Sequence, residues 1–126
     1  MVTFSRFEDI NAWQKARTLA NAVYRASDGG KFSRDFSFRD QIRRSALSVM
    51  ANIAEGQGRK SDKEFANFLN IAIGSVAETK SHLYVAHDLE YIGESDFAHL
   101  YGLSDEVGRM LTSLAKFLIN KTRPPS

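Results

Sequence analysis

A glycine-rich run is the sequence's closest approach to a phosphate-binding motif. The run Gly56-Gln57-Gly58-Arg59-Lys60-Ser61 combines two glycines, two basic residues and a serine. It is not a P-loop, because that motif needs a preceding strand and a lysine directly after its last glycine, where Arg59 stands here. What remains is a predicted helix start flanked by Arg59, Lys60 and Lys63, whose backbone N–H groups and positive charge attract phosphate. The alternative is an ordinary turn between helices, in which the glycines supply only backbone freedom.

A second basic group lies in the first half of the second predicted helix. It consists of Arg39, Arg43 and Arg44, and it is remote from the Arg59 end of that helix. Arg43 flanks the apolar stripe, so we expect its stem to lie on the core and its guanidinium to pair with a carboxylate of a neighbouring helix. Arg44 points away from the stripe, and we expect it on the surface.

The histidines and acidic residues lack the spacing that metal or hydrolytic catalysis needs in a helical protein. A bundle holds metal when Glu-x-x-His pairs from two helices converge, and no such pair is present, although Asp96 and His99 have that separation. No pattern indicates a nucleophile turn or an oxyanion site. The absence of cysteine excludes disulfides, thiolate metal sites and cysteine nucleophiles. We therefore expect a protein that is not an enzyme and that holds no metal or cofactor.

Length and composition indicate one compact domain. The chain has 126 residues, of which 43% are hydrophobic and 25% charged. A chain of this size buries enough surface to fold without disulfides or a structural metal. We expect a single domain over residues 1–126 with short flexible ends at about 1–7 and 122–126. No apolar run reaches the roughly 18 to 20 residues of a membrane span, and the start lacks the layout of a signal peptide. A cytoplasmic protein without a membrane partner is expected.

The net charge of +2 hides an uneven distribution along the chain. Residues 1–63 contain twelve Lys or Arg and seven Asp or Glu, whereas residues 64–126 contain five and eight. A polyanion would be attracted to the first half. The alternative is that mixed charges simply solvate the surfaces of helices.

Four stretches with apolar residues at helical spacing predict four helices. The first runs from Asp9, its expected N-cap, to Ser27, and glycines 29 and 30 end it. The longest loop follows, up to Ser37. The second helix starts there and closes at Glu55-Gly56.

The last two helices have clearer boundaries. The third begins at Ser61, which can share a reciprocal cap with Glu64, and it persists to about Glu90. The fourth begins with a cap at Ser95 and runs out before Thr122. Because short connections make neighbouring helices antiparallel, the predicted architecture is an all-α, up-down-up-down four-helix bundle.

The third helix carries more apolar residues than one buried face can hold. Ile71, Ile73, Val85 and Leu89 lie outside its main stripe, and apolar residues on two sides of a long helix are typical of a self-association surface. The alternative is the ordinary scatter of hydrophobic residues on a surface.

Asn52 and Glu55 place polar side chains at the closing turn of the second helix. A half-buried carboxylate needs a partner, and for Glu55 we expect Arg59 or a backbone N–H of the following turn. We therefore predict a structural role for both residues.

Short motifs spread from Phe7 to about Ile119 carry a family resemblance. They are Trp13-Gln14-Lys15-Ala16, Gln41-Ile42-Arg43-Arg44-Ser45-Ala46, Asn52-Ile53-Ala54-Glu55-Gly56, Gly58-Arg59, Glu64-Phe65, Phe68-Leu69 and Gly74-Ser75 with Glu78. Together they resemble the four-helix-bundle proteins encoded in 23S rRNA intervening sequences. The sequence departs from that pattern at Met50, where many members have proline. The resemblance implies a small bacterial protein, similar to the accessory protein of diversity-generating retroelements, which forms a basic ring of five bundles and engages nucleic acid and a reverse transcriptase.

The leading hypothesis is a non-enzymatic, homo-oligomeric bundle that binds nucleic acid, structured RNA before DNA, through phosphate contacts. The residues expected to contact phosphate are Arg39, Arg44, Arg59, Lys60 and Lys63. The residues expected in the oligomer interface are Ile71, Ile73, Val85 and Leu89, and the family resemblance implies a pentamer. One alternative is a protein-interaction scaffold for a nucleic-acid-processing enzyme, with no nucleic-acid binding of its own. Another is a metal-dependent bundle enzyme, which a metal assay would exclude.

Overall fold

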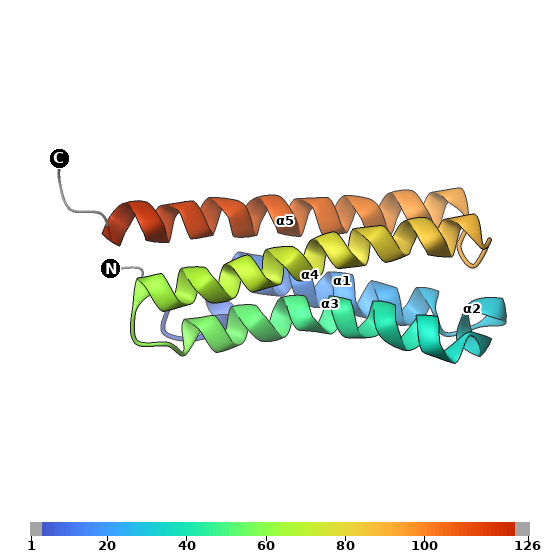
Figure 1. The fold of residues 1–126 in the computed structure, drawn as a ribbon, viewed down its shortest axis with the longest axis horizontal. Coiled ribbons are helices and arrows are strands. Elements are labelled where there is room, and N and C mark those ends of the chain that lie inside the picture. Colours follow the sequence, from blue (N-terminus) through green and yellow to red (C-terminus); the bar gives the residue numbers. More distant parts are fainter. Residues whose placement is uncertain (1–3, 123–126) are drawn as a thin grey trace.

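The computed structural model describes residues 4–122, and every regular element in that range is helical. Four long helices form the body of the protein, and two short helical segments precede the first and second of them (Figure 1). In chain order the elements are the 3-10 helix η1 (Phe7–Asp9) and the α-helices α1 (Asn11–Ala26), α2 (Gly30–Arg34), α3 (Phe36–Gln57), α4 (Asp62–Asp88) and α5 (Glu94–Thr122).

The long helices form one antiparallel bundle (Figure 1). α4 packs along both α3 and α5, and α1 closes the bundle by contacting α3 and α5. The result is two layers, α1 with α3 and α4 with α5, and α2 lies at the end opposite the α3–α4 turn. The predicted all-α, single-domain bundle of four antiparallel helices is confirmed.

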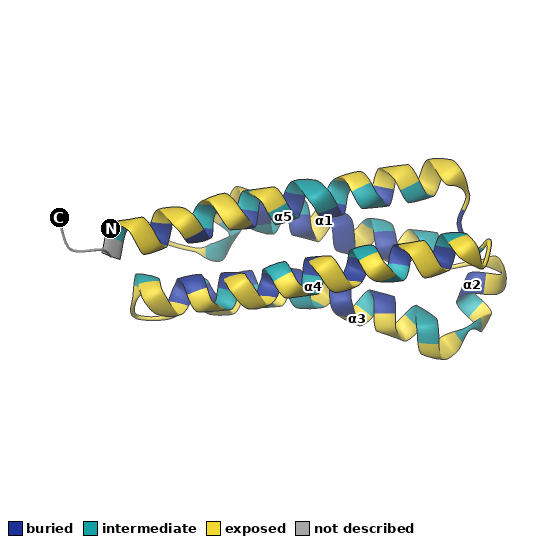
Figure 2. Cartoon of the chain, turned by 45° about the horizontal axis from the view of Figure 1, so that its top comes forward, coloured by how far each residue is buried: buried dark blue, intermediate teal, exposed yellow. Residues whose placement is uncertain are grey.

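The core follows the helical spacing of the apolar residues, and buried residues recur between exposed ones along each long helix (Figure 2). On α4, Leu69, Val76 and Leu83 recur every seven residues and are at most 3% exposed, which is the repeat of one buried helix face. One apolar cluster fills the half of the bundle near the α3–α4 turn, and a second fills the half near α2.

The start of α1 differs from the prediction. Asp9 is the last residue of η1, and α1 begins at Asn11 with Ile10 as its N-cap, which has no side chain that accepts a hydrogen bond. The prediction that Asp9 caps this helix is therefore wrong. Ile10 is 2% exposed, so burial of an apolar side chain, rather than a polar cap, sets this boundary.

The ends of the chain are more ordered than predicted where the structure describes them. Phe4 packs against the core, and Gln57 donates a hydrogen bond from Nε2 to the carbonyl oxygen of Phe4 at 2.8 Å. The predicted flexible end therefore does not extend through residues 4–7. α5 includes Thr122, so the fourth helix ends later than predicted. The predictions for residues 1–3 and 123–126 lie outside the described residues.

The predicted long loop after α1 contains the helix α2. Gly30 has a φ of 62°, as the glycine pair suggested, but it begins α2 instead of only ending α1. Phe32 anchors α2 because its side chain is 1% exposed and its ring lies 5.3 Å from that of Tyr91. The cap of α3 is Asp35, whose carboxylate accepts from the Phe38 N–H, so the predicted start at Ser37 is wrong.

The connection between α3 and α4 follows the prediction closely. α3 ends at Gln57, one residue beyond the predicted close at Glu55-Gly56. Ser61 is the N-cap of α4, and its hydroxyl accepts from the Glu64 N–H at 3.1 Å. The sequence signal for this helix start is therefore confirmed.

The end of α4 is a left-handed cap built on a residue other than glycine. Tyr91 N–H donates to the Ala86 carbonyl at 2.8 Å and Glu90 N–H donates to the His87 carbonyl at 3.0 Å, the paired bonds of a Schellman motif. Glu90 holds the left-handed position with a φ of 59°. α5 then begins at Glu94, so Ser95 lies inside the helix and the predicted cap there is wrong.

Replacing Glu90 with glycine is expected to raise the free energy of unfolding by about 0.5–1 kcal/mol, because glycine adopts a positive φ without the clash that a Cβ causes. Urea unfolding would measure the change. Glu90→Ala is the control, since it removes the carboxylate and keeps the Cβ. If alanine stabilised the protein as much as glycine, the backbone explanation would be wrong.

Candidate nucleic-acid interface

The charge difference along the sequence becomes a difference between the two layers of the bundle. α1 contains three basic residues and no acidic one, and α2 adds two basic residues. α3 contains three arginines and two acidic residues. In the other layer, α4 has two lysines against four acidic residues, and α5 has three basic against four acidic residues. The layer of α1 and α3 is therefore the electropositive one.

Most exposed cations of the electropositive side have no acidic partner. Within residues 4–122, the exposed basic residues of α1, α2 and α3 that form no ion pair are Arg17, Arg25, Lys31, Arg34 and Arg44, and Lys60 and Lys63 at the α3–α4 turn form none either. Of these, Arg25 lines a hollow between α1 and α5 with Asp96 and His99. A cation that forms no ion pair can contact phosphate without the loss of a salt bridge.

Arg44 lies on the surface in the middle of the positive layer, as predicted. It lines a shallow hollow of about 260 Å³ with Tyr24, Asp40, Arg43 and Leu47. The hollow joins α1 and α3, so this part of the surface takes residues from both helices of the layer.

Arg43 ties α3 to the end of α1. Its Nε donates to Ser27 Oγ at 2.8 Å, its Nη2 donates to the Ser27 carbonyl oxygen at 3.2 Å, and its guanidinium lies 4.5 Å from the centre of the Tyr24 ring. The predicted structural role is confirmed, but the predicted carboxylate partner is wrong. The partners are oxygen atoms at a helix C-terminus, where backbone carbonyls lack helical partners and the helix dipole is negative.

Arg43→Ala is expected to lower the free energy of unfolding by about 2 kcal/mol, because hydrogen bonds from a charged group to partly buried oxygens are lost. Arg44→Ala, one residue along the same helix, is expected to change stability by less than about 0.5 kcal/mol. Urea unfolding of the two variants compares them directly. Equal losses would show that Arg43 has no special role in joining the helices.

Arg59 is only partly free at the α3–α4 turn. Its Nη2 donates to Glu55 Oε1 at 2.9 Å, and its guanidinium lies 4.7 Å from the centre of the Phe68 ring. The predicted Glu55–Arg59 pair is confirmed. Glu55 is not half-buried, however, since its side chain is 56% exposed, so the pair contributes little to stability.

Lys60 and Lys63 are exposed beside this pair. A small hollow of about 100 Å³ at the turn is lined in part by Arg59, Lys60 and Ser61. The Ser61 hydroxyl already accepts from an N–H of α4. The cations at this end that form no ion pair within residues 4–122 are therefore Lys60 and Lys63.

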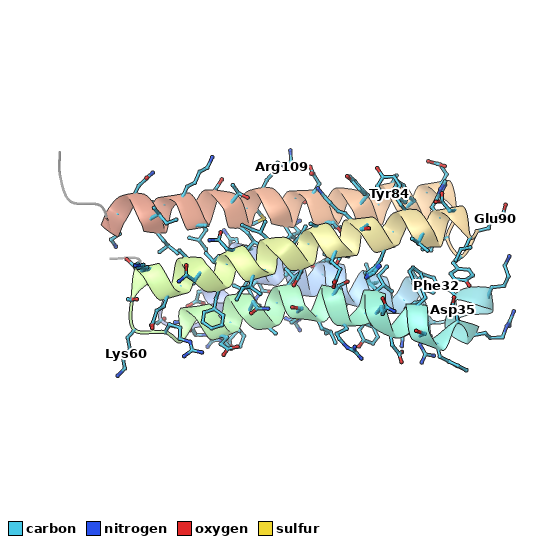
Figure 3. All side chains as sticks on the ribbon, in the orientation of Figure 1. Phe32, Asp35, Lys60, Tyr84, Glu90 and Arg109 are labelled. Carbon is cyan, nitrogen blue, oxygen red and sulfur yellow. The ribbon has the colours of Figure 1, made fainter. Side chains whose placement is uncertain are left out.

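Arg39 lies at the other end of α3. Its side chain is 24% exposed, and it donates to Asp40 Oδ1 and to the Ser33 carbonyl oxygen, both at 3.1 Å. Figure 3 shows Lys60 at one end of the bundle and Asp35, which precedes α3, at the other. α3 is about 33 Å long at 1.5 Å per residue. The predicted phosphate contacts on α3 and at the turn that follows it therefore form separate groups rather than one patch.

Asn52 has the predicted structural role. Its Nδ2 donates to the Ser48 carbonyl oxygen at 2.8 Å and to Ser48 Oγ at 3.0 Å. Ser48 Oγ in turn lies 2.8 Å from Ser75 Oγ on α4. Asn52 therefore belongs to a polar contact between α3 and α4 rather than to the surface that faces a ligand.

The opposite layer has paired charges at its centre. Lys80 donates to Asp105 Oδ1 at 2.9 Å, and this hydrogen bond lowers the pKa of the Asp105 carboxyl, with a smaller contribution from Arg109. Among residues 4–122 no three histidine or acidic side chains come together as a metal-ligand group.

The predicted oligomer residues do not all share one environment. Ile71, Val85 and Leu89 on α4 are exposed, at 53%, 41% and 46%. Ile73 differs from them, because it is half-buried and packs against the core; its place in an oligomer interface stays a prediction. It lines an open groove of about 480 Å³ between α4 and α5.

Sequence reasoning missed Arg17 and Arg25 on α1 and Lys31 and Arg34 on α2. The complete absence of acidic residues from α1 was a usable signal. The basic residues of α2 were not among the candidates because the sequence predicts a loop for that segment.

No helix within residues 4–122 combines the length and the apolar character that crossing a membrane requires. The chain is similar to the crystal structure of a protein of unknown function from the S23 ribosomal protein family of Bacteroides thetaiotaomicron VPI-5482, with a TM-score of 0.77 and 29% identity. That similarity covers 83% of this chain and 98% of the other. No curated protein matches the chain. The model of one family matches residues 8–113, and the chain therefore belongs to the 23S rRNA-intervening sequence protein family.

Proposed function

We propose that the protein is a non-enzymatic, homo-oligomeric bundle of the cytoplasm that binds nucleic acid through phosphate contacts. The observation that supports this proposal is the separation of charge between the two layers, with exposed and unpaired cations on the layer of α1 and α3. Phosphate contacts position a nucleic acid without reading its bases, so the expected binding is insensitive to sequence.

The basic groups extend along the bundle. Lys31 and Arg34 stand at one end, Arg44 lies in the middle, and Lys60 and Lys63 stand at the other end. The intervening helix of about 33 Å is close to one helical turn of duplex DNA, about 34–36 Å. We place structured RNA before DNA as the ligand because the family takes its name from a 23S rRNA insert.

Titration of the full chain with a structured RNA and with duplex DNA between about 50 and 200 mM salt tests this function. The logarithm of affinity is expected to fall with the logarithm of salt concentration, with a slope near 0.9 per phosphate contact for the duplex. Binding that is absent or unaffected by salt would contradict the proposal. It would favour the alternative of a scaffold for a nucleic-acid-processing enzyme, for which the groove between α4 and α5 offers a docking surface.

Self-association belongs to the same proposal, since several copies multiply the positive layer. Ile71, Val85 and Leu89 expose apolar surface on α4, and burying it against other copies is favourable. The resemblance to the accessory protein of diversity-generating retroelements makes a pentamer the expected size.

Light scattering is expected to give a mass several times the 14.1 kDa of one chain. Leu89→Glu should shift the protein to smaller species, because the new charge would have to be buried. Leu47→Glu makes the same change at an exposed position of α3 and should leave the mass unchanged. A wild-type mass of one chain would rule out the oligomer.

A further inference from the structure

Phe36 has the most exposed of the large apolar side chains in the described part of the chain. It is the first residue of α3 and is 64% exposed. The neighbouring aromatic residues behave differently, since Phe32 is 1% exposed and Phe38 is half-buried with its ring 5.6 Å from that of Phe32. Two phenylalanines therefore fill this end of the bundle, and Phe36 faces solvent.

The guanidinium of Arg39 lies over one face of the Phe36 ring. The central carbon of the Arg39 guanidinium lies 5.0 Å from the centre of the ring. Arg39 is itself fixed, because it donates to the Ser33 carbonyl oxygen and to the Asp40 carboxylate. A cation over one face of an aromatic ring restrains the ring, and the exposed surface of Phe36 remains open to a ligand.

The short helix before Phe36 carries two cations. α2 adjoins the start of α3 (Figure 1). Its Lys31 and Arg34 are exposed, and neither forms an ion pair within residues 4–122. The carboxylate of Asp35 is occupied by the hydrogen bonds that it accepts from Phe38 N–H and from the Tyr91 hydroxyl, the latter at 2.7 Å. An open aromatic ring beside free cations suits a nucleotide, whose base stacks while its phosphates bind the cations.

We propose that Phe36 stacks on one unpaired nucleobase while Lys31 and Arg34 bind the neighbouring phosphates. This inference rests on the proposed nucleic-acid function and gives it a substrate class, RNA with an unpaired loop or end. Every base has a π face, so stacking favours unpaired over paired RNA without selecting a sequence.

The test compares a hairpin RNA that has an unpaired loop with a blunt RNA duplex of the same number of phosphates. Phe36→Ala is expected to weaken hairpin binding about tenfold, the order expected for stacking on one base, and to leave duplex binding unchanged. Phe36→Trp should keep the hairpin affinity. Phe117→Ala removes an exposed phenylalanine from α5, in the other layer of the bundle, and should change neither affinity. Because Phe36 is exposed, circular dichroism should show that all variants remain folded.

Other results would overturn the inference in distinguishable ways. Equal weakening for both RNAs, or none for either, would remove the stacking role and leave phosphate binding intact. A change in oligomer mass with Phe36→Ala would assign the ring to a contact with a second copy. If the wild-type protein binds neither RNA in a salt-sensitive manner, the proposed function fails and the stacking role fails with it.

Discussion

Replacing Gly56 with alanine is expected to lower the free energy of unfolding by about 1–3 kcal/mol, the usual cost of overpacking. An added Cβ would lie 2.7 Å from Phe68 Cβ and 3.0 Å from Phe65 Cδ1. Phe68 Cβ is attached directly to the backbone of α4, so no side-chain rotation can move it away. α3 and α4 would have to separate near the turn that joins them.

Gly74 provides the matched control within α4. It is exposed, and no atom lies within 4 Å of the position that its Cβ would take. Gly74→Ala is expected to stabilise the protein by about 0.5–1 kcal/mol, because glycine is less favourable than alanine inside a helix. Urea unfolding should therefore give opposite signs at the two positions. A gain in stability for Gly56→Ala would contradict the close packing of α3 and α4.

Removing two cations from the positive side is expected to weaken nucleic-acid binding far more than removing two from the other side. In the double variant Arg44→Ala/Lys60→Ala, the slope of log affinity against log salt should fall by about 2, one for each lost phosphate contact. Arg44 and Lys60 are exposed and form no ion pair within residues 4–122, so stability should barely change.

The control for this double variant is Arg109→Ala/Lys116→Ala on α5. It removes the same charge from exposed positions and should leave the slope unchanged. Equal effects of the two double variants in filter-binding or anisotropy titrations would mean that only net charge matters. The layer of α1 and α3 would then have no special role.

The sequence predicted the long helices because their buried residues repeat at helical spacing, as Leu69, Val76 and Leu83 do. Boundaries were predicted where a local side chain forms the cap, as at Ser61. Helix boundaries were missed where tertiary contacts determine the residue at which a helix begins or ends. α2 exists because Phe32 is buried against Tyr91, which is distant in sequence, and no local pattern reveals that contact.

The sequence predicted the environment of several single residues in the candidate interface, but not how these residues are arranged on the surface. Exposure of Arg44 and the pairing of Arg59 with Glu55 follow from helical spacing, and both were found. The acceptors of Arg43 are backbone and hydroxyl oxygens at the end of another helix, and their position depends on how the helices pack. The half-burial of Ile73 likewise depends on tertiary packing, since Ile73 packs against the core and lines the groove between α4 and α5.

Lysine footprinting of the full chain with and without structured RNA tests the central claim most directly. Acetylation by a small reagent, read by mass spectrometry, reports which lysines the RNA covers. Lys60 and Lys63 at the α3–α4 turn and Lys31 on α2 are exposed, as is Lys116 on α5. The charge separation predicts that RNA protects the first three lysines and leaves Lys116 reactive. Protection of Lys116 alone, or equal reactivity of all four with and without RNA, would contradict binding by the cations of α2 and of the α3–α4 turn.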